Sequence, residues 1–356
     1  MISSQFVAIV ERLMRAPAAP FYETYVQREV QNICEESGLP MERDAFGNIF
    51  VSWKSDSAQR PLVLAAHLDH PGFEIKRVLT PKKLLAQFQG GVPIQCFRKG
   101  TPIRVFPGSI AGKLGAKRQK QFELELQSPI VEKPQFAVWD LVDFKRNKGR
   151  IIGRACDDLI GVAAILCTLQ ELKRTRSRVH VIGLLSRAEE VGFLGALAAM
   201  RGASIPKNAL VISLEASQER PPVRMGEGVI LRVGDRTSIF DSAACRFLWE
   251  VAKELEKKNR AFRFQRALMP GGTCEGTAFQ EFGFQTAAVC VALGNYHNRT
   301  ADNRIGEEYV EVKDGVNMAE LLVSAARQLR DFTTLVHRLP RDLNRLAQKA
   351  VKRLKL

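Results

Sequence analysis

Strand-like apolar runs alternate with helical segments through most of this 356-residue chain. The apolar runs lie at 61–69, 179–186, 209–215, 228–233 and 286–293. Helical patterns lie between or after them, at 157–172, 194–201, 240–258, 274–281 and 312–330. Alternation of this kind predicts an α/β fold, a doubly wound mixed sheet with helices on both of its faces.

Residues 76–150 have a different character. Turn signals at Gly90-Gly91, Lys99-Gly100 and Pro107-Gly108 separate short β-like runs such as TPIRVF, FELEL and LVDFK. We expect this segment to be an inserted, basic, β-barrel-like domain. The α/β domain would then be discontinuous, formed by residues 1–75 and 151–335.

The last segment, residues 336–356, predicts a basic amphipathic helix. Its apolar residues recur at helical spacing, with arginine and lysine between them. These apolar residues are Leu339, Leu343, Leu346, Ala350 and Leu354.

The positive charge of the chain is concentrated in two segments. The net charge is +15, yet residues 76–150 alone hold 16 Lys/Arg against 5 Asp/Glu, and residues 338–356 hold 7 against 1. A solvated face, an acidic partner subunit, an anionic surface or nucleic acid could each account for such segments. No interleaving of aromatic and basic residues supports RNA binding, so nucleic acid is not expected as a partner.

Two further features bear on the compartment. No apolar run reaches the roughly 18 residues that a membrane span needs, and the first residues, MISSQFVAIVERLM, lack the pattern of a signal peptide. The seven cysteines show no CxxC spacing, which argues against a disulfide framework. We therefore expect a cytoplasmic protein.

Five residues of metal-ligand type follow, or closely follow, these strand-like runs. They are His67, Asp157, Glu190, Glu215 and His297. Each alone has a simpler interpretation, such as a strand-end histidine or an acidic residue compensating a helix dipole. Together they fit two cations that share one carboxylate, because imidazole and carboxylate groups are the usual ligands of catalytic zinc. Carboxyl ends of strands are also where open α/β sheets place functional groups.

Two other carboxylates complete this constellation. Glu189 precedes Glu190, so one of the pair can bind metal while the other moves protons. Asp69 stands two residues after His67 and is expected to accept the second ring N–H of that histidine. The remaining histidines, His70, His180 and His337, are expected to be surface or strand residues.

The motifs HLDHPGFEI, ACDDLIG, SRAEEVGFLGA and SLEAS, with the late Tyr-His pair, resemble the tetrahedral-aminopeptidase branch of the dinuclear zinc peptidases, which includes glutamyl aminopeptidases. The resemblance covers about residues 20–330, and GGVPIQCFRKGTPIRV resembles the start of that family's β-barrel insert. It implies a zinc-exopeptidase-like sheet, a homo-oligomer and hydrolysis of N-terminal residues from small peptides. It also implies two divalent metal ions, zinc first, with cobalt or manganese as alternatives.

The resemblance assigns a role to each residue. His67, Glu190, Glu215 and His297 would hold the metals, Asp157 would bridge them, and Asp69 would support His67. Glu189 would be the general base and acid for a water that bridges the metals. The peptide bond between Asp157 and Asp158 is expected to be cis.

Three departures from the family pattern leave alternatives open. Glu215 stands where aspartate is usual, which in related peptidases can accompany carboxypeptidase or amide deacylase activity. Leu159 replaces a usual arginine, and Thr273-Cys274-Glu275 replaces a usual Thr-Asp-Ala. An inactive basic adaptor on a peptidase scaffold is the remaining alternative, although the five candidate ligands and Glu189 are all present.

Overall fold

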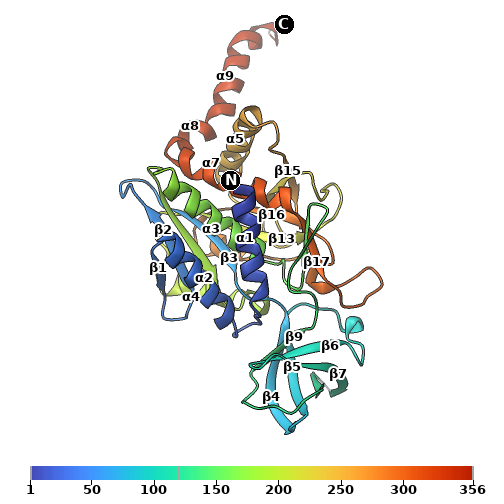
Figure 1. The fold of residues 1–356 in the computed structure, drawn as a ribbon. Helices are drawn as coiled ribbons and strands as arrows, with labels where there is room; N and C mark the ends of the chain where they lie inside the picture. Colours follow the sequence, from blue (N-terminus) through green and yellow to red (C-terminus); the bar gives the residue numbers. More distant parts are fainter. Residues whose placement is uncertain (1, 119, 355–356) are drawn as a thin grey trace.

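The computed structural model describes residues 2–118 and 120–354, and an eight-stranded mixed sheet forms the centre of the larger domain (Figure 1). Its strand order is β1-β2-β12-β3-β13-β16-β14-β15. The bounds are β1 Met41–Arg43, β2 Ile49–Lys54, β3 Leu62–His67, β12 His180–Ser186, β13 Leu210–Gln218, β14 Val229–Gly234, β15 Phe264–Leu268 and β16 Gln285–Leu293. Four adjacent strands, β12, β3, β13 and β16, are parallel to one another. The predicted mixed α/β sheet is thus confirmed, and β15 is a strand that the sequence did not indicate.

Helices cover both faces of this sheet because its central strands are apolar on both sides. In β3, Leu62, Leu64 and Ala66 pack into one core, whereas Val63 and Ala65 pack into another on the opposite face. The larger core is closed by α1 Ile2–Arg15, α2 Thr24–Ser37, α3 Leu159–Arg174, α5 Ser242–Lys258 and α7 Val312–Gln328. The smaller core is closed by α4 Leu194–Arg201 and α6 Glu275–Glu281. This two-sided burial matches what parallel strands require.

The inserted segment forms a closed six-stranded antiparallel barrel, set apart from the sheet in Figure 1. The strand order is β4-β5-β8-β7-β6-β9, with bounds β4 Gly72–Thr80, β5 Lys83–Gln89, β6 Pro102–Phe106, β7 Ile110–Arg118, β8 Gln121–Leu126 and β9 Phe136–Trp139. Aromatic rings fill its interior, with Phe73 in edge contact with Phe88, Phe122 and Trp139. The predicted barrel is confirmed.

A small three-stranded sheet joins the exit of the barrel to a late part of the chain. It consists of β10 Lys145–Asn147, β11 Arg150–Gly153 and β17 Glu308–Glu311, in the order β10-β11-β17. Residues 145–150, which the sequence placed within the insert, lie in this sheet and not in the barrel. The short turn η1, Ile94–Cys96, lies between β5 and β6.

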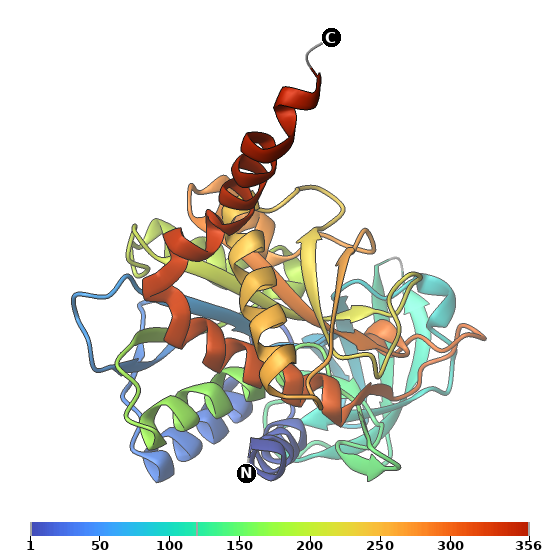
Figure 2. The same cartoon turned by 90° about the horizontal axis from the view of Figure 1, so that it is seen from above.

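The C-terminal helix α9, Arg338–Ala350, follows α8, Phe332–Val336, and projects away from the body of the molecule (Figure 2). None of its residues is buried. Leu343 is 55% exposed and Leu346 62% exposed, so the apolar stripe has no cover within the described residues. Among those residues, we find no helix with the length and apolarity to cross a membrane.

Candidate metal centre

The four parallel strands at the middle of the sheet bring most of the candidate ligands to one edge. His67 is the last residue of β3 and pairs in register with Ser186, the last residue of β12. Glu189 and Glu190 follow the end of β12 after two intervening residues, in the turn η2 Glu189–Val191. The turn η3, Tyr296–Asn298, follows β16 and contains His297. These groups converge because carboxyl ends of parallel strands lie at the same edge of a sheet.

Glu215 differs from the sequence expectation in its position. It lies inside β13, three residues before the end, because β13 continues to pair with β16 as far as Gln218. The side chain is only 8% exposed. Glu215 is therefore a residue of a paired strand, whereas the neighbouring candidates lie at strand ends or in turns.

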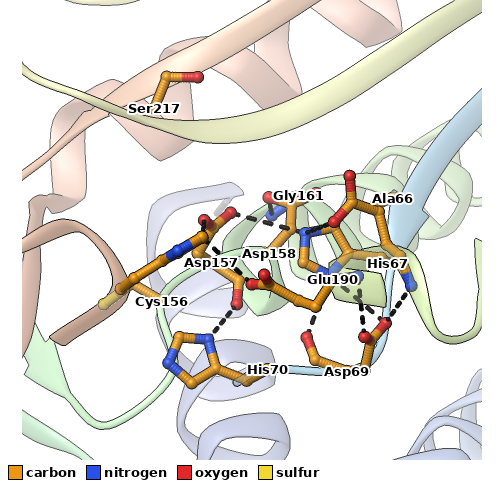
Figure 3. Close-up of polar contacts among 12 residues, drawn as sticks. Ala66, His67, Asp69, His70, Cys156, Asp157, Asp158, Gly161, Glu190 and Ser217 are labelled. Atoms are coloured by element: carbon orange, nitrogen blue, oxygen red, sulfur yellow. Dashed lines mark hydrogen bonds and ion pairs between the residues drawn. The ribbon is translucent and has the colours of Figure 1, made fainter. Parts of the chain in front are cut away.

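Asp157 occupies the centre of the constellation. It precedes α3, and the next residue, Asp158, caps that helix by accepting a hydrogen bond from the Gly161 N–H at 3.1 Å. One carboxylate oxygen of Asp157 lies 3.6 Å from Nε2 of His67 (Figure 3). The other lies 3.6 Å from Nε2 of His297. The peptide bond between Asp157 and Asp158 is cis, as expected. The two oxygens of one carboxylate thus face two different histidines.

Two groups of side chains have the composition and spacing of metal sites. One is His67, Asp157 and Glu215, and the other is Asp157, Glu190 and His297. Within each group, the potential ligand atoms all lie within 4.8 Å of one another. Ligand atoms 2.0–2.2 Å from a tetrahedral zinc ion are about 3.3–3.6 Å apart, which agrees with the 3.3 Å between His297 Nε2 and Glu190 Oε1. These residues therefore fit divalent cations.

Unsatisfied oxygens give independent support for this fit. Asp157 Oδ1, Glu190 Oε1 and Glu215 Oε1 are buried and receive no hydrogen bond from the described residues. Burial raises the pKa of Glu215 to about 8. Burial lowers the pKa of His67, but neighbouring carboxylates, Glu189 foremost, outweigh it and hold the pKa well above its usual value. Without metal, the cluster therefore binds protons, which supply the positive charge that its buried carboxylates require.

Main-chain carbonyl groups fix the orientation of both histidines. His67 Nδ1 lies 3.0 Å from the Asp69 carbonyl oxygen, and His297 Nδ1 lies 3.2 Å from the Gly91 carbonyl oxygen. Each carbonyl can accept only an N–H, which leaves Nε2 of the ring free as a ligand. Gly91 belongs to the loop after β5, so the barrel domain contributes directly to this centre.

The Asp69 side chain is placed differently from the expectation. Its carboxylate is 3.7 Å from His67 Nδ1, beyond hydrogen-bonding distance. It accepts instead the N–H groups of Glu189 and Glu190, at 2.9 and 3.2 Å. The reason is that these two N–H groups stand at the start of the turn after β12, where they have no acceptor within the turn, and the turn lies beside the end of β3. Asp69 therefore holds the turn that carries the two glutamates.

Two residues beneath Asp157 were not recognised in the sequence. Glu308, in β17, is fully buried and accepts the N–H groups of Cys156 and Asp157 at 2.8 and 3.2 Å. His70 was expected at the surface or in a strand, but it is 1% exposed and contacts the Asp157 carbonyl at 2.8 Å (Figure 3). Its other ring nitrogen lies 3.0 Å from Asn298 Oδ1. Only the position of His70 three residues after His67 could have suggested this role.

Glu189 lies beside the candidate ligands but in neither metal group. Its Oε2 is 4.0 Å from His67 Nε2. Burial, followed by the charges of Glu215, Glu190 and the buried Glu275, raises the pKa of Glu189 well above its usual value. A carboxyl group with this pKa next to the metal groups can both accept and donate a proton.

Three cavities meet at Tyr296. The metal cavity, of about 200 Å³, is lined by both metal groups, Glu189 and Thr273. A small side pocket of about 110 Å³ lies beside Glu215 and is lined by Met269, Arg232 and the 270–274 loop. A wide cavity of about 710 Å³ begins at His297 and Gly91 and extends past Arg220. The centre is thus open to a ligand with both a small and an extended part.

Comparison with known families agrees with this geometry. The model of the M42 glutamyl aminopeptidase family matches residues 124–307. The chain belongs to this family. The matched region contains four of the five candidate ligands, and membership in the M42 family confirms the prediction of an enzyme that hydrolyses peptide bonds.

Solved structures share the whole fold at low identity. The TET1 peptidase of Pyrococcus horikoshii, described as assembling into a tetrahedron or a large octahedral shell, is 21% identical with a TM-score of 0.76, over 90% of this chain and 99% of its own. An aminopeptidase from the archaeon Desulfurococcus kamchatkensis is 19% identical with a TM-score of 0.75, over 94% and 98%. A TET aminopeptidase from a marine sediment Thaumarchaeota archaeon is 18% identical with a TM-score of 0.77, over 92% and 99%. The M42 chain thus keeps the two-domain fold of these peptidases.

Proposed function

We propose that this M42 protein is a dinuclear metal-dependent aminopeptidase that removes N-terminal residues from small peptides. The observation that carries the proposal is the position of Asp157, whose two carboxylate oxygens face the Nε2 atoms of His67 and His297. One carboxylate between two complete ligand groups is the arrangement expected for two cations about 3.5–4 Å apart.

His67, Asp157 and Glu215 would hold one cation, and Asp157, Glu190 and His297 the other. Zinc suits these imidazole and carboxylate donors, as do cobalt and manganese. When bound, the cations activate a water molecule and polarise the peptide carbonyl. The orphaned oxygens of Asp157, Glu190 and Glu215 support this assignment.

Glu189 would move the protons of the reaction. It takes a proton from the attacking water and gives it to the leaving amine, as the general base and then the general acid. Its raised pKa suits the second step. Asp69 would act as a positioning residue, because its carboxylate binds the N–H groups of Glu189 and Glu190.

The side pocket would receive the side chain of the N-terminal residue. Arg232 in its wall is only 4% exposed, and its Nε has no hydrogen-bond acceptor among the described residues. A buried cation without a full set of acceptors favours a carboxylate ligand. We therefore propose acidic N-terminal residues, which agrees with the glutamyl aminopeptidase description of the family. Replacing Arg232 by methionine should lower kcat/KM for glutamyl substrates much more than for leucyl ones.

Homo-oligomerisation is part of the proposal. A TET1 peptidase chain of similar fold was solved as a dodecamer, and it is 21% identical to this chain. Size-exclusion chromatography with light scattering would test it, and a monomer at all concentrations would contradict it.

Metal analysis combined with a substrate panel tests the proposed reaction. The wild-type protein should hold two divalent ions per chain and cleave peptides that have a free N-terminus. Cleavage of N-blocked peptides, or release of C-terminal residues, would instead indicate an amide deacylase or a carboxypeptidase. A protein that binds no metal, cleaves no peptide and binds a polyanion in a salt-dependent way would instead match the adaptor alternative.

Substitution of the paired glutamates separates their roles. Glu189→Gln should retain both metals and lose about 10²–10⁴-fold in kcat, the range usual for a lost general base. Glu190→Gln, the matched control one residue away, should lose metal as well as activity. Full activity of metal-loaded Glu189→Gln would refute the assignment.

A further inference from the structure

The wide cavity beside the metal groups is lined by three arginines and one carboxylate. The arginines are Arg220, Arg236 and Arg299, and the carboxylate is Glu219. With a volume of about 710 Å³, the cavity is in the size range of sites that enclose whole small-molecule ligands. It shares Gly91, Tyr296 and His297 with the metal cavity, so a ligand can reach from one into the other.

None of the three arginines has a carboxylate partner. Within residues 2–118 and 120–354, no acidic side chain lies within ion-pair distance of any of these guanidinium groups, although most ion pairs of the chain involve arginine. Arg220 donates to Gln218 Oε1 at 3.0 and 2.6 Å, Arg299 donates to Asn303 Oδ1 at 2.8 Å, and Arg236 donates to the Gly271 carbonyl. All of these acceptors are neutral, so the positive charge of the cavity is not balanced from within it.

The single carboxylate of the cavity does not cancel this charge. Glu219 Oε1 accepts the Met225 N–H at 2.9 Å, which directs that oxygen to the main chain. Three guanidinium groups in a concave wall raise the local concentration of anions and orient carboxylates through paired N–H donors. An extended anionic ligand is the chemical class that fits.

The relative size of the two substrate cavities indicates which part of a peptide enters each. The side pocket, at about 110 Å³, has room for one side chain. The wide cavity is more than six times larger and adjoins the metal cavity at His297. Residues after the scissile bond therefore extend into the wide cavity.

We infer that the arginine-lined cavity binds carboxylates of the peptide portion that leaves, so that the enzyme prefers short peptides with acidic groups after the scissile bond. This inference rests on the proposed aminopeptidase function but concerns a different part of the substrate from the N-terminal side chain. The carboxylate can come from an acidic side chain or from the C-terminus of the peptide.

A peptide series with a constant first residue tests the preference. Glu-Ala-Ala, Glu-Glu-Glu and Glu-Lys-Lys would be compared, each as the free acid and as the C-terminal amide. We expect KM to be lowest for Glu-Glu-Glu and highest for amidated Glu-Lys-Lys. A penalty from amidation alone assigns the C-terminal carboxylate as the ligand, whereas a penalty from alanine at the later positions assigns the side chains; both results support the inference.

Matched arginine substitutions locate the effect. Arg236→Gln and Arg299→Gln, at residues that line the wide cavity and not the side pocket, should each raise KM for Glu-Glu-Glu up to about fivefold. This factor corresponds to an exposed ion pair of about 1 kcal/mol. Neither substitution should raise KM for amidated Glu-Lys-Lys. Arg201→Gln, which removes another exposed arginine outside the cavity, is the control and should change neither value. The difference should shrink with added salt.

A binding measurement keeps this test independent of turnover. Calorimetric titration with the product-like peptide Glu-Glu should show binding that is weakened in the double variant Arg236→Gln, Arg299→Gln. Equal binding of Glu-Glu and Lys-Lys, or equal KM across the peptide series, would overturn the inference even if the enzyme is active. Failure to cleave any peptide would overturn the proposed function, while the titration would still decide whether the cavity binds carboxylates.

Discussion

A methyl group added at Gly91 should weaken one metal position and not the other. A Cβ atom at this position would lie 3.2 Å from both Cε1 and Nδ1 of His297. Unstrained contacts of this kind begin at about 3.5 Å, so the ring would have to move by about 0.3 Å. Metal–ligand distances tolerate about 0.2 Å. The position formed by Asp157, Glu190 and His297 would therefore lose metal affinity.

The expected size of the effect is about 10–100-fold in metal affinity, the range found when a group that orients a ligand is disturbed. This corresponds to about 1.4–2.7 kcal/mol. Stepwise metal titration of the Gly91→Ala protein, followed by calorimetry, would measure both positions. The His67–Asp157–Glu215 group serves as the internal control, because His67 is oriented by Asp69 and not by the barrel loop. Wild-type affinity at both positions, with unchanged kcat, would refute the reasoning.

Three further outcomes are expected. Metal affinity should rise with pH between about 5 and 9, because a cation must displace protons from Glu215 and His297. Burial raises the pKa of Glu215 to about 8, and Glu190 raises the pKa of His297 to about 9 against the effect of burial. Calorimetry at pH 7 in buffers of different ionisation enthalpy would measure the proton release, and its absence would contradict the prediction. Glu308→Gln should lower the free energy of unfolding by about 1–3 kcal/mol. One carboxylate oxygen of Glu308 accepts the N–H groups of Cys156 and Asp157 and the other accepts that of Asn298, so the amide nitrogen of glutamine would leave one side without an acceptor. Urea denaturation would measure the change, and an unchanged midpoint would contradict it. Removal of 339–356 should change Tm little, as no residue of α9 is buried; a large loss would show that the helix packs on the body.

The alternation of strands and helices, and the positions of candidate ligands after strand-like runs, could be predicted because both depend on local patterns. Apolar runs of strand length followed by polar residues predict parallel strands whose carboxyl ends converge. The sequence therefore indicated which residues meet, including His67, Asp157 and His297. It did not indicate β15, whose residues Phe264–Leu268 have no continuous apolar run and form the edge of the sheet.

Contacts between distant segments could not be predicted. Glu308 lies 151 residues from Asp157 and reaches it only because β17 pairs with β11. Gly91 reaches His297 from another domain, across 206 residues. No local pattern in a single sequence reports such pairings. The same holds for Asp69, which was expected to accept the ring N–H of His67. Its carboxylate binds instead the N–H groups of the turn after β12, a strand far from Asp69 in the sequence.

The location of Glu215 within a paired strand determines how the centre would adjust to a cation of another radius. The β13 ladder with β16 fixes the main chain on both sides of Glu215, whereas Glu190 and His297 project from short 3₁₀ turns. Groups on strands hold their position better than groups on loops. Exchange of a bound zinc ion for the larger manganese ion should therefore displace the turns and leave β13 in place.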